Sequence, residues 1–140
     1  MSDRSMPQFP EPDTLPFWEA AKNKKLKYQQ CNLCNIAVFY PRFACTLCGN
    51  GELEWKESKG EGEIYTYSVV RQNRNPAFAD LGAYVLAYVD LDEGFRMMSN
   101  IVGIKNPITD VKIGQRVKVK FEKQDSGEFP VPVFELIQCH

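Results

Sequence analysis

The stretch that decides the fold is CNLCNIAVFYPRFACTLC, residues 31–48. It contains two Cys-x-x-Cys knuckles separated by ten residues, and the sulfur atoms belong to Cys31, Cys34, Cys45 and Cys48. Each knuckle turns tightly enough for two thiolates to reach one ion, and two knuckles provide the tetrahedral sulfur set of a structural zinc site. The spacing therefore predicts one structural zinc ion per chain.

A zinc site of this kind dominates the stability of a small module. Its binding free energy is on the order of 10 kcal/mol or more, which matches the whole stability of a small domain. Around the first knuckle, Leu26 to Gln30 and Val38 to Tyr40 have the composition of short strands, as in a zinc ribbon. We therefore expect metal loss to unfold at least residues 26–56.

Other chemistries compete with zinc for these cysteines. An iron ion would use the same four sulfur atoms, and coordination geometry alone does not separate the two metals, so iron stays as the less favoured alternative. Iron–sulfur clusters gather several cysteines in one run, and the duplicated knuckle argues against two disulfides or a redox pair. The fifth cysteine, Cys139, stands beside His140, where we expect an exposed tail and not a Cys-His pair.

Upstream of the knuckles, residues 1–25 have the composition of a proline-rich arm followed by a short helix. Asp13 or Thr14 can cap this helix, and Phe17 and Trp18 lie on its apolar stripe. So short a helix is not stable alone. Its aromatic side chains therefore need a partner surface, either the β domain of this chain or another subunit.

Downstream of the knuckles, the sequence alternates as strands do. Five strands without intervening helices are predicted, at 64–70, 83–91, 95–102, 117–121 and 133–138. Five short strands in about 80 residues suit a small closed barrel better than an open sheet with two exposed edges. The predicted fold is mainly β, with an N-terminal arm and helix (1–25), a zinc ribbon (26–58) and an OB-like barrel (59–140).

The charge balance restricts the function classes. The chain has 17 Lys and Arg against 18 Asp and Glu, a formal net charge of −1, so it presents no bulk positive field to a phosphate backbone. Apolar residues make up 44% of the chain, a globular proportion. Apolar runs such as 84–89 fall far short of the roughly 20 residues of a membrane helix, and no export signal is visible. We expect a cytoplasmic protein without membrane attachment.

The sequence offers little catalytic machinery. The single histidine is His140, so a Ser-His-Asp set cannot be built, and no glycine-rich phosphate loop is present. Asp90, Asp92 and Glu93 form an acidic cluster at a predicted hairpin turn, where carboxylates are most often solvated turn residues. We therefore predict no catalytic residue and expect that the chain is not an enzyme by itself.

Two groups of side chains could contact a ligand. Arg71, Arg74 and Phe78 lie in a predicted loop, and guanidinium groups with an aromatic ring could hold a phosphorylated or nucleotide-like ligand. Tyr65 and Tyr67 are predicted on one strand face and could stack bases, which makes a single-stranded nucleic-acid-binding module the alternative function. Cross-strand packing explains these tyrosines equally well, and the near-neutral charge favours packing.

The sequence resembles a known family in which a rubredoxin-like zinc ribbon precedes an OB fold, a domain of unknown function encoded beside thiolase-type acyl-CoA enzymes. The resemblance covers nearly the whole chain. Asn35 departs from it, because a glycine often follows the first knuckle, and Ala83 replaces a frequent proline. Besides the knuckles, the resemblance rests on Pro16-Phe17-Trp18-Glu19-Ala20, Phe39-Tyr40-Pro41-Arg42, Leu53-Glu54-Trp55, Gly60-Glu61-Gly62, Tyr84-Val85-Leu86-Ala87, Leu91-Asp92-Glu93-Gly94 and Ile113-Gly114-Gln115-Arg116-Val117.

The resemblance implies a non-catalytic accessory or scaffold subunit that binds a thiolase-like, lipid-transfer-type or hydroxymethylglutaryl-CoA-synthase-like enzyme. The partner would carry out thiolytic or retro-aldol cleavage, as in aromatic or steroid acyl-CoA degradation, and this chain would help it hold or pass the acyl-CoA. A rubredoxin-like electron carrier is a third hypothesis. The candidate contacts to acyl-CoA or to the partner are Phe17, Trp18, Arg42, Arg71, Arg74 and Phe78.

Overall fold

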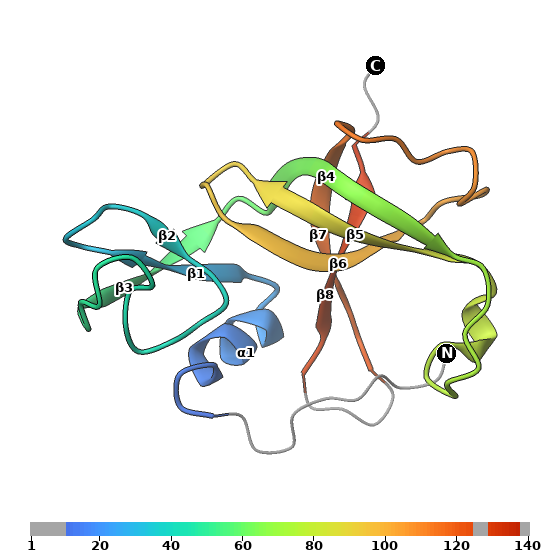
Figure 1. Cartoon of the computed structure of the whole chain (residues 1–140). Helices are drawn as coiled ribbons and strands as arrows, with labels where there is room; N and C mark the ends of the chain where they lie inside the picture. The colour runs from blue at the N-terminus through green and yellow to red at the C-terminus, as the bar shows by residue number, and fades with distance from the viewer. Residues whose placement is uncertain (1–10, 125–128, 138–140) are drawn as a thin grey trace.

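The computed structural model spans the 140-residue chain and describes residues 11–124 and 129–137. The strands form a three-stranded sheet and a closed five-stranded barrel, with the α-helix beside them (Figure 1). The predicted mainly β fold, with one N-terminal helix, a ribbon and an OB-like barrel, is confirmed. In chain order the elements are α1 (Leu15–Lys22), β1 (Leu26–Cys31), β2 (Ala37–Val38), β3 (Leu53–Ser58), β4 (Glu61–Val70), the 3-10 helix η1 (Ala79–Leu81), β5 (Tyr84–Leu91), β6 (Arg96–Val102), β7 (Arg116–Glu122) and β8 (Val131–Leu136).

The helix α1 lies where the local sequence predicts it. Pro16 occupies the first turn, where its missing N–H costs no helical hydrogen bond. Thr14 is the N-cap residue, but its hydroxyl donates to a carbonyl upstream instead of capping the helix. Phe17 is buried in the hydrophobic core of this chain, so the chain itself supplies a partner surface for the helix. Neither helix of the described residues is long and apolar enough to cross a membrane.

The ribbon sheet has the strand order β2-β1-β3, and both pairings are antiparallel. Strand β3 was not among the predicted strands, because charged residues interrupt its apolar alternation. It nevertheless pairs with the whole of β1, from Ser58 opposite Leu26 to Leu53 opposite Cys31. This pairing returns the chain that follows the second knuckle to the side of the first knuckle.

The barrel closes in the order β4-β5-β6-β8-β7, and β7 pairs back onto β4. All neighbours are antiparallel except β6 and β8, which run parallel. The five predicted barrel strands are all present, with ends shifted by a few residues. Strand β4 begins earlier than predicted because residues 61–63 pair with β7 and close the barrel.

A β-bulge in β4 overturns the prediction that two tyrosines share one strand face. The register with β5 shifts between Ile64 and Thr66, so Tyr65 is an extra residue without a cross-strand partner. Tyr65 is 50% exposed, with the guanidinium of Arg96 over its ring at 3.5 Å, whereas Tyr67 packs against the core. The extra residue reverses the alternation of the strand, and no platform for stacking bases is formed by this pair.

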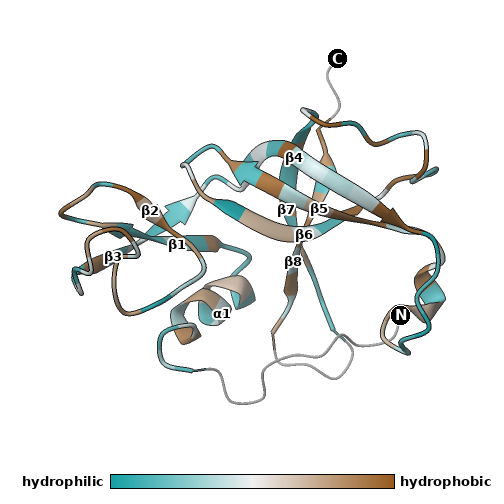
Figure 2. Cartoon of the chain, in the orientation of Figure 1, coloured by the Kyte–Doolittle hydropathy of each residue, from teal (hydrophilic) through white to brown (hydrophobic). Residues whose placement is uncertain are grey.

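One hydrophobic core joins the helix, the ribbon and the barrel. Phe17, Leu26 and Tyr28 belong to the same cluster as the inward-facing side chains of the barrel. The ring of Phe95, at the β5–β6 turn, lies 4.9 Å from that of Tyr28 and 4.9 Å from that of Phe39 in the ribbon. Hydrophobic stretches accordingly occur in all three parts (brown in Figure 2). Aromatic packing therefore holds the ribbon against the barrel.

Candidate functional site

The four predicted metal ligands lie together in the ribbon. Their sulfur atoms are all within 4.8 Å of one another, and those of Cys31 and Cys48 are 3.7 Å apart. All four are free cysteines. Cys31 and Cys45 are buried, Cys34 is half-buried and Cys48 is exposed. This arrangement directs four sulfur donors at one metal ion.

The two knuckles share one backbone design. The residue after each knuckle, Asn35 or Gly49, has a left-handed φ of 58° or 77°, and its N–H donates to the carbonyl of the first cysteine of that knuckle. Backbone N–H groups also point at sulfur, from Cys34 to Cys31 and from Leu47 to the first sulfur of its knuckle, both at 3.4 Å. Asparagine tolerates left-handed backbone better than most residues, so Asn35 preserves the turn that a glycine would make.

The acidities of the thiols indicate that the cluster suits a cation. The N–H of Cys34 is the main cause that lowers the pKa of Cys31 to about 6. The pKa of Cys34 is instead raised to about 12, chiefly by its hydrogen bond with the sulfur of Cys48 and then by burial. The crowded sulfurs therefore resist ionising together, whereas a divalent cation stabilises all four thiolates. The donor set fits zinc, held in a closed structural site.

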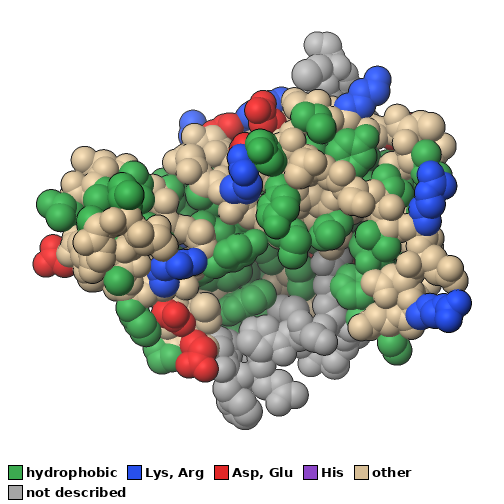
Figure 3. All heavy atoms as spheres, in the orientation of Figure 1, with side chains coloured by type: hydrophobic (Ala, Val, Ile, Leu, Met, Phe, Trp, Pro, Cys, Tyr) green, Lys and Arg blue, Asp and Glu red, His purple; other side chains and the backbone are tan. Residues whose placement is uncertain are grey.

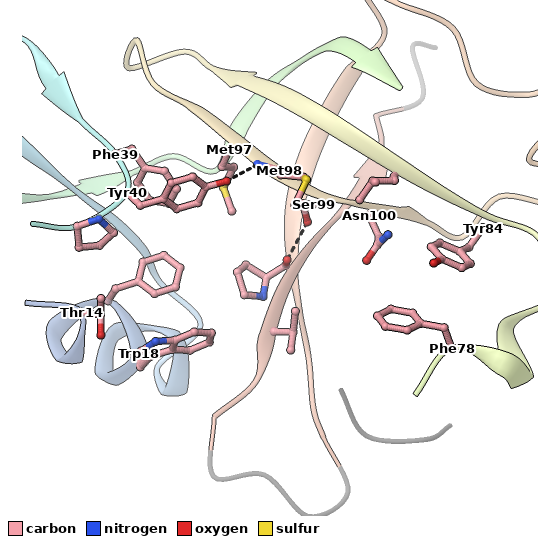
Figure 4. Close-up of a pocket in the computed structure, with 15 residues that line it drawn as sticks. Thr14, Trp18, Phe39, Tyr40, Phe78, Tyr84, Met97, Met98, Ser99 and Asn100 are labelled. Carbon is pink, nitrogen blue, oxygen red and sulfur yellow. Dashed lines mark hydrogen bonds between the residues drawn. The ribbon is translucent and has the colours of Figure 1, made fainter. Parts of the chain in front are cut away.

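The segment between the knuckles is tied to the rest of the chain by hydrogen bonds. The side-chain amide of Gln29, 5% exposed, donates to the carbonyl of Arg42 at 2.9 Å and accepts from the N–H of Arg42 at 2.8 Å. The N–H of Met98 in β6 donates to the hydroxyl of Tyr40 at 3.1 Å (Figure 4). These bonds hold residues 39–42 between the sulfur cluster and the barrel.

An apolar cavity of about 420 Å³ opens where α1, this segment and the barrel meet. Figure 3 shows hydrophobic side chains gathered in a hollow on this face, and Figure 4 shows the lining side chains converging on it. No Asp, Glu, Lys or Arg is among the described residues that line it. The lining consists of Thr14, Phe17, Trp18, Phe39, Tyr40, Pro41, Phe78, Tyr84, Leu86, Met97, Met98, Ser99, Asn100, Val131 and Pro132.

Three of the six predicted contact residues line this cavity. Phe17 and Trp18 reach it from α1, and Phe78 reaches it from the loop after β4. The ring of Phe78 stacks on that of Tyr84 with centroids 5.5 Å apart. Residues separated by some 60 positions in the sequence are thus brought to one site.

The three predicted arginines do not line the cavity. Arg42, Arg71 and Arg74 are exposed. The Nε of Arg42 donates to the carbonyl of Tyr40 at 3.0 Å, which keeps its guanidinium near its own loop. Contact of these arginines with acyl-CoA or with a partner stays a prediction.

The sequence analysis did not identify the side of the cavity formed by β5 and β6. Leu86 pairs with Asn100 across these strands, and its neighbours Val85 and Ala87 are buried in the barrel core. Leu86 therefore lies on the outer face of the barrel. A signal was present, because an apolar residue on the outer face of a strand needs a covering element.

The acidic cluster at the β5–β6 turn has structural partners. Asp90 and Asp92 form ion pairs with arginines of β6 and β7, each at 2.6 Å. Glu93 accepts hydrogen bonds from the hydroxyl of Ser58 at 2.5 Å and from the N–H of Lys59 at 2.9 Å. The carboxylates of the two aspartates are partly exposed, as expected at a turn, but they also form ion pairs with β6 and β7. None of the three acidic residues lines the cavity.

Two protein families match successive parts of the chain. Residues 18–54 match the family described as ChsH2, rubredoxin-like zinc ribbon domain. Residues 55–122 match the family described as ChsH2, C-terminal OB-fold domain. The ribbon match agrees with the sulfur cluster and supports zinc as the metal.

Curated relatives are about one third identical to this chain over the aligned residues. A Thermomonospora curvata protein named "Probable enoyl-CoA hydratase alpha subunit" is 36% identical over 84% of this chain, which spans 36% of that relative. A DUF35 domain-containing scaffold protein of Methanothermobacter thermautotrophicus is 32% identical over 83% of this chain and 87% of its own length. Its namesake in Methanocaldococcus jannaschii is 35% identical over 67% of this chain and 65% of its own.

Solved structures repeat the architecture over nearly the full length. A chain of an Ltp2-ChsH2(DUF35) aldolase superposes with a TM-score of 0.81 and 34% identity, covering 94% of this chain and 98% of its own. A Sulfolobus solfataricus DUF35 protein of unknown function has a TM-score of 0.65 at 15% identity and shares the fold. Ribbon, barrel, family matches and sequence identity together show that this chain belongs to the ChsH2 (DUF35) family.

Proposed function

We propose that this chain is a non-catalytic accessory subunit of an acyl-CoA enzyme complex. It binds a thiolase-like or aldolase subunit and helps that subunit hold or pass the acyl-CoA. The observation that carries the proposal is the likeness, over 94% of this chain, to a chain of the Ltp2-ChsH2(DUF35) aldolase. Relatives named as scaffold proteins and as an enoyl-CoA hydratase subunit support the same role.

The described residues support binding more than chemistry. The sulfur cluster has four protein donors, which leaves a metal ion without an open position for substrate. The carboxylates of the acidic cluster are engaged with β6, β7 and the linker before β4. The described residues that line the cavity are mostly aromatic and aliphatic, and tyrosine is the only ionisable type among them. Such a surface suits recognition by a partner that carries the reacting groups.

One zinc ion per chain completes the proposal. The ion would be held by Cys31, Cys34, Cys45 and Cys48 and would join both ends of the segment that forms one wall of the cavity. Its role is structural, because it fixes that wall and the ribbon strands without contacting a ligand.

A single-stranded nucleic-acid-binding module is the less favoured function. The net charge of −1 provides no attraction for phosphates. The bulge in β4 also places Tyr65 and Tyr67 on opposite faces of that strand. The two tyrosines therefore cannot stack bases together on its outer face.

The test is purification of the tagged full-length chain from its native cells, with mass spectrometry of bound proteins and elemental analysis of metal. A parallel purification of the tag alone controls for adventitious binding. We expect a thiolase-like or aldolase subunit in stoichiometric amounts, with one zinc per chain.

Other results would replace the proposal. Recovery of single-stranded nucleic acid, released steeply by salt, would favour the nucleic-acid module. A red, iron-loaded protein without an enzyme partner would favour an electron carrier. An acyl-CoA enzyme from the same cells that is fully active alone and binds nothing when this chain is added would contradict the accessory role.

A further inference from the structure

We propose that the cavity between α1, residues 39–41 and the β5–β6 face binds the hydrocarbon acyl group of a CoA thioester, and that the nucleotide stays outside it. The thioester rests on the proposed function, whereas the hydrocarbon class rests on the lining of the cavity. At about 420 Å³, the cavity lies within the size range of sites for small organic ligands.

The lining excludes a charged occupant. None of the described lining residues is Asp, Glu, Lys or Arg. Burying a phosphate or carboxylate against such a surface would cost several kcal/mol without a compensating ion pair. An uncharged hydrocarbon loses no hydrogen bonds on entering. The described lining therefore offers no partner for the phosphates of CoA, whereas it suits the acyl group.

The polar side chains of the lining are already engaged within the protein. The hydroxyl of Ser99 donates to the carbonyl of Pro132 at 2.9 Å (Figure 4). The Nδ2 of Asn100 donates to the carbonyl of Val85 at 2.9 Å. These bonds satisfy donors that would otherwise demand a polar ligand, and they leave an apolar surface toward the cavity.

The outer face of β5 shows where the binding surface begins and ends. Tyr84, Leu86 and Tyr88 alternate along this face, while Val85 and Ala87 point into the core. Tyr84 and Leu86 line the cavity, but Tyr88 does not and is 44% exposed. Leu86 and Tyr88 therefore share the outer face of β5, but only Leu86 contacts the cavity.

The walls of the cavity combine rigid and adaptable side chains. Trp18 is braced by Phe129, whose ring lies 5.8 Å away. Met97 is buried and Met98 is 49% exposed, and both line the β6 side. Unbranched methionine side chains adjust to ligands of different shape. The cavity can therefore accept hydrocarbon groups of different shapes, and a partner subunit would select among them.

The first measurement is calorimetric titration of the zinc-loaded full chain with CoA, hexanoyl-CoA, octanoyl-CoA and decanoyl-CoA. Each added methylene buried in the cavity is expected to tighten binding about fourfold until the cavity is filled. The heat capacity change should be negative, because apolar surface is removed from water. Equal affinity for CoA and all three thioesters would overturn the proposal.

The matched variants are Leu86→Trp and Tyr88→Trp, which place an indole on the same face of β5. Filling the cavity with Leu86→Trp should weaken octanoyl-CoA binding about tenfold or more, because the indole occupies the ligand volume. Tyr88→Trp should bind as the unmodified chain does. Unchanged octanoyl-CoA affinity in a folded Leu86→Trp protein would count against the cavity.

A fluorescence readout keeps the test decisive if Leu86→Trp does not fold. Trp18 and Trp55 are the two tryptophans of the chain, so Trp55→Phe leaves Trp18 as the sole emitter, on the cavity wall. Its emission should change saturably with octanoyl-CoA and not with CoA. A Trp18 emission that does not change when octanoyl-CoA is added would show that the acyl group does not enter the cavity.

Co-purification of the tagged chain with an acyl-CoA enzyme tests the proposed function separately from this inference. A chain that retains an acyl-CoA enzyme but shows no dependence on acyl length would overturn the inference and leave the accessory role standing. A chain that binds octanoyl-CoA at the cavity but retains no such enzyme would support the ligand class and contradict the accessory role.

Discussion

Gln29 connects the strand next to the metal site with the segment that forms one wall of the cavity. It lies in β1 near Cys31 and is 5% exposed. Its amide satisfies both the N–H and the carbonyl of Arg42, at 2.8 Å and 2.9 Å. Leaving such buried groups unpaired costs about 1–3 kcal/mol. One side chain therefore anchors Arg42 and, through it, the segment between the knuckles whose residues 39–41 line the cavity.

Asp92 makes stability depend on pH. The hydrogen bonds from Arg116, together with its positive charge, lower the pKa of this carboxyl below its usual range. Because the folded pKa is depressed, the stabilisation is present above the unfolded pKa and is lost as the pH falls through the folded value. Both side chains are over 40% exposed, so we expect Asp92→Asn to lower the unfolding free energy by less than about 1 kcal/mol at neutral pH. Urea denaturation across pH measures this difference.

The control for this prediction is the double-mutant cycle with Arg116→Gln. The coupling between the two positions should vanish as the pH falls through the folded pKa of Asp92, because the carboxylate is then protonated, and it should weaken in high salt. A coupling that persists unchanged at low pH would show that the ion pair is not its source.

Among the elements, the linker between β3 and β4 fixes how the ribbon meets the barrel. Glu93 at the β5–β6 turn accepts from Ser58 and Lys59, and the hydroxyl of Ser58 accepts from the N–H of Gly60 at 2.9 Å. The carbonyl of Gly60 in turn accepts from the N–H of Val119 in β7 at 2.7 Å. The linker is thus bound on both sides, which sets the direction in which β4 leaves the ribbon.

Gly60 is required in this linker for two reasons. Its φ of +74° is left-handed, and a Cβ at this position would overlap the side chain of Val119. We expect Gly60→Ala to destabilise the protein by about 2–5 kcal/mol, from backbone strain plus overpacking. Gly114→Ala is the matched control, because its φ is +88° with nothing within 4 Å of the added Cβ.

The control should lose only about 1–2 kcal/mol, the cost of the backbone conformation. Urea denaturation of the zinc-loaded proteins compares the two variants. If both lost the same amount, overlap with Val119 would not contribute.

At the scale of the whole molecule, the ribbon and the barrel share a core. Tyr28 and Phe39 from the ribbon contact Phe95 from the barrel. Phe39 and Tyr40 also form one wall of the cavity. The metal site is therefore coupled to the cavity through the ribbon, although no ligand sulfur lines the cavity.

Zinc removal should act on both parts to different degrees. We propose that residues 26–58 open as one unit when the metal is chelated, because two knuckles then lose their common ion. The barrel should stay folded with a lower melting temperature, since Tyr28 and Phe39 leave the shared core. Hydrogen exchange read by mass spectrometry, before and after chelation, measures this difference.

Return of protection on adding zinc back is the control for irreversible damage. Uniform loss of protection over ribbon and barrel would contradict a division between residues 58 and 59. It would show instead that the chain unfolds as one cooperative unit.

The sequence by itself determined the parts that depend on local spacing. Two knuckles with identical spacing predict a shared metal ion, and period-two alternation identifies the barrel strands because each has one buried face. The family resemblance followed from the same segments. Strand β3 was not predicted, because its pairing with β1, and not its own apolar pattern, makes it a strand.

Only the tertiary structure decided which residues meet. A single bulge between Ile64 and Thr66 reverses the facing of Tyr67, and no periodicity reveals where such a residue is inserted. The cavity joins Trp18 to Phe78 and Leu86, which lie 60 and 68 positions later in the sequence, and leaves the predicted arginines outside. The physical reason is that side-chain types and local spacing are properties of a segment, whereas a cavity is a property of how several segments pack around one core.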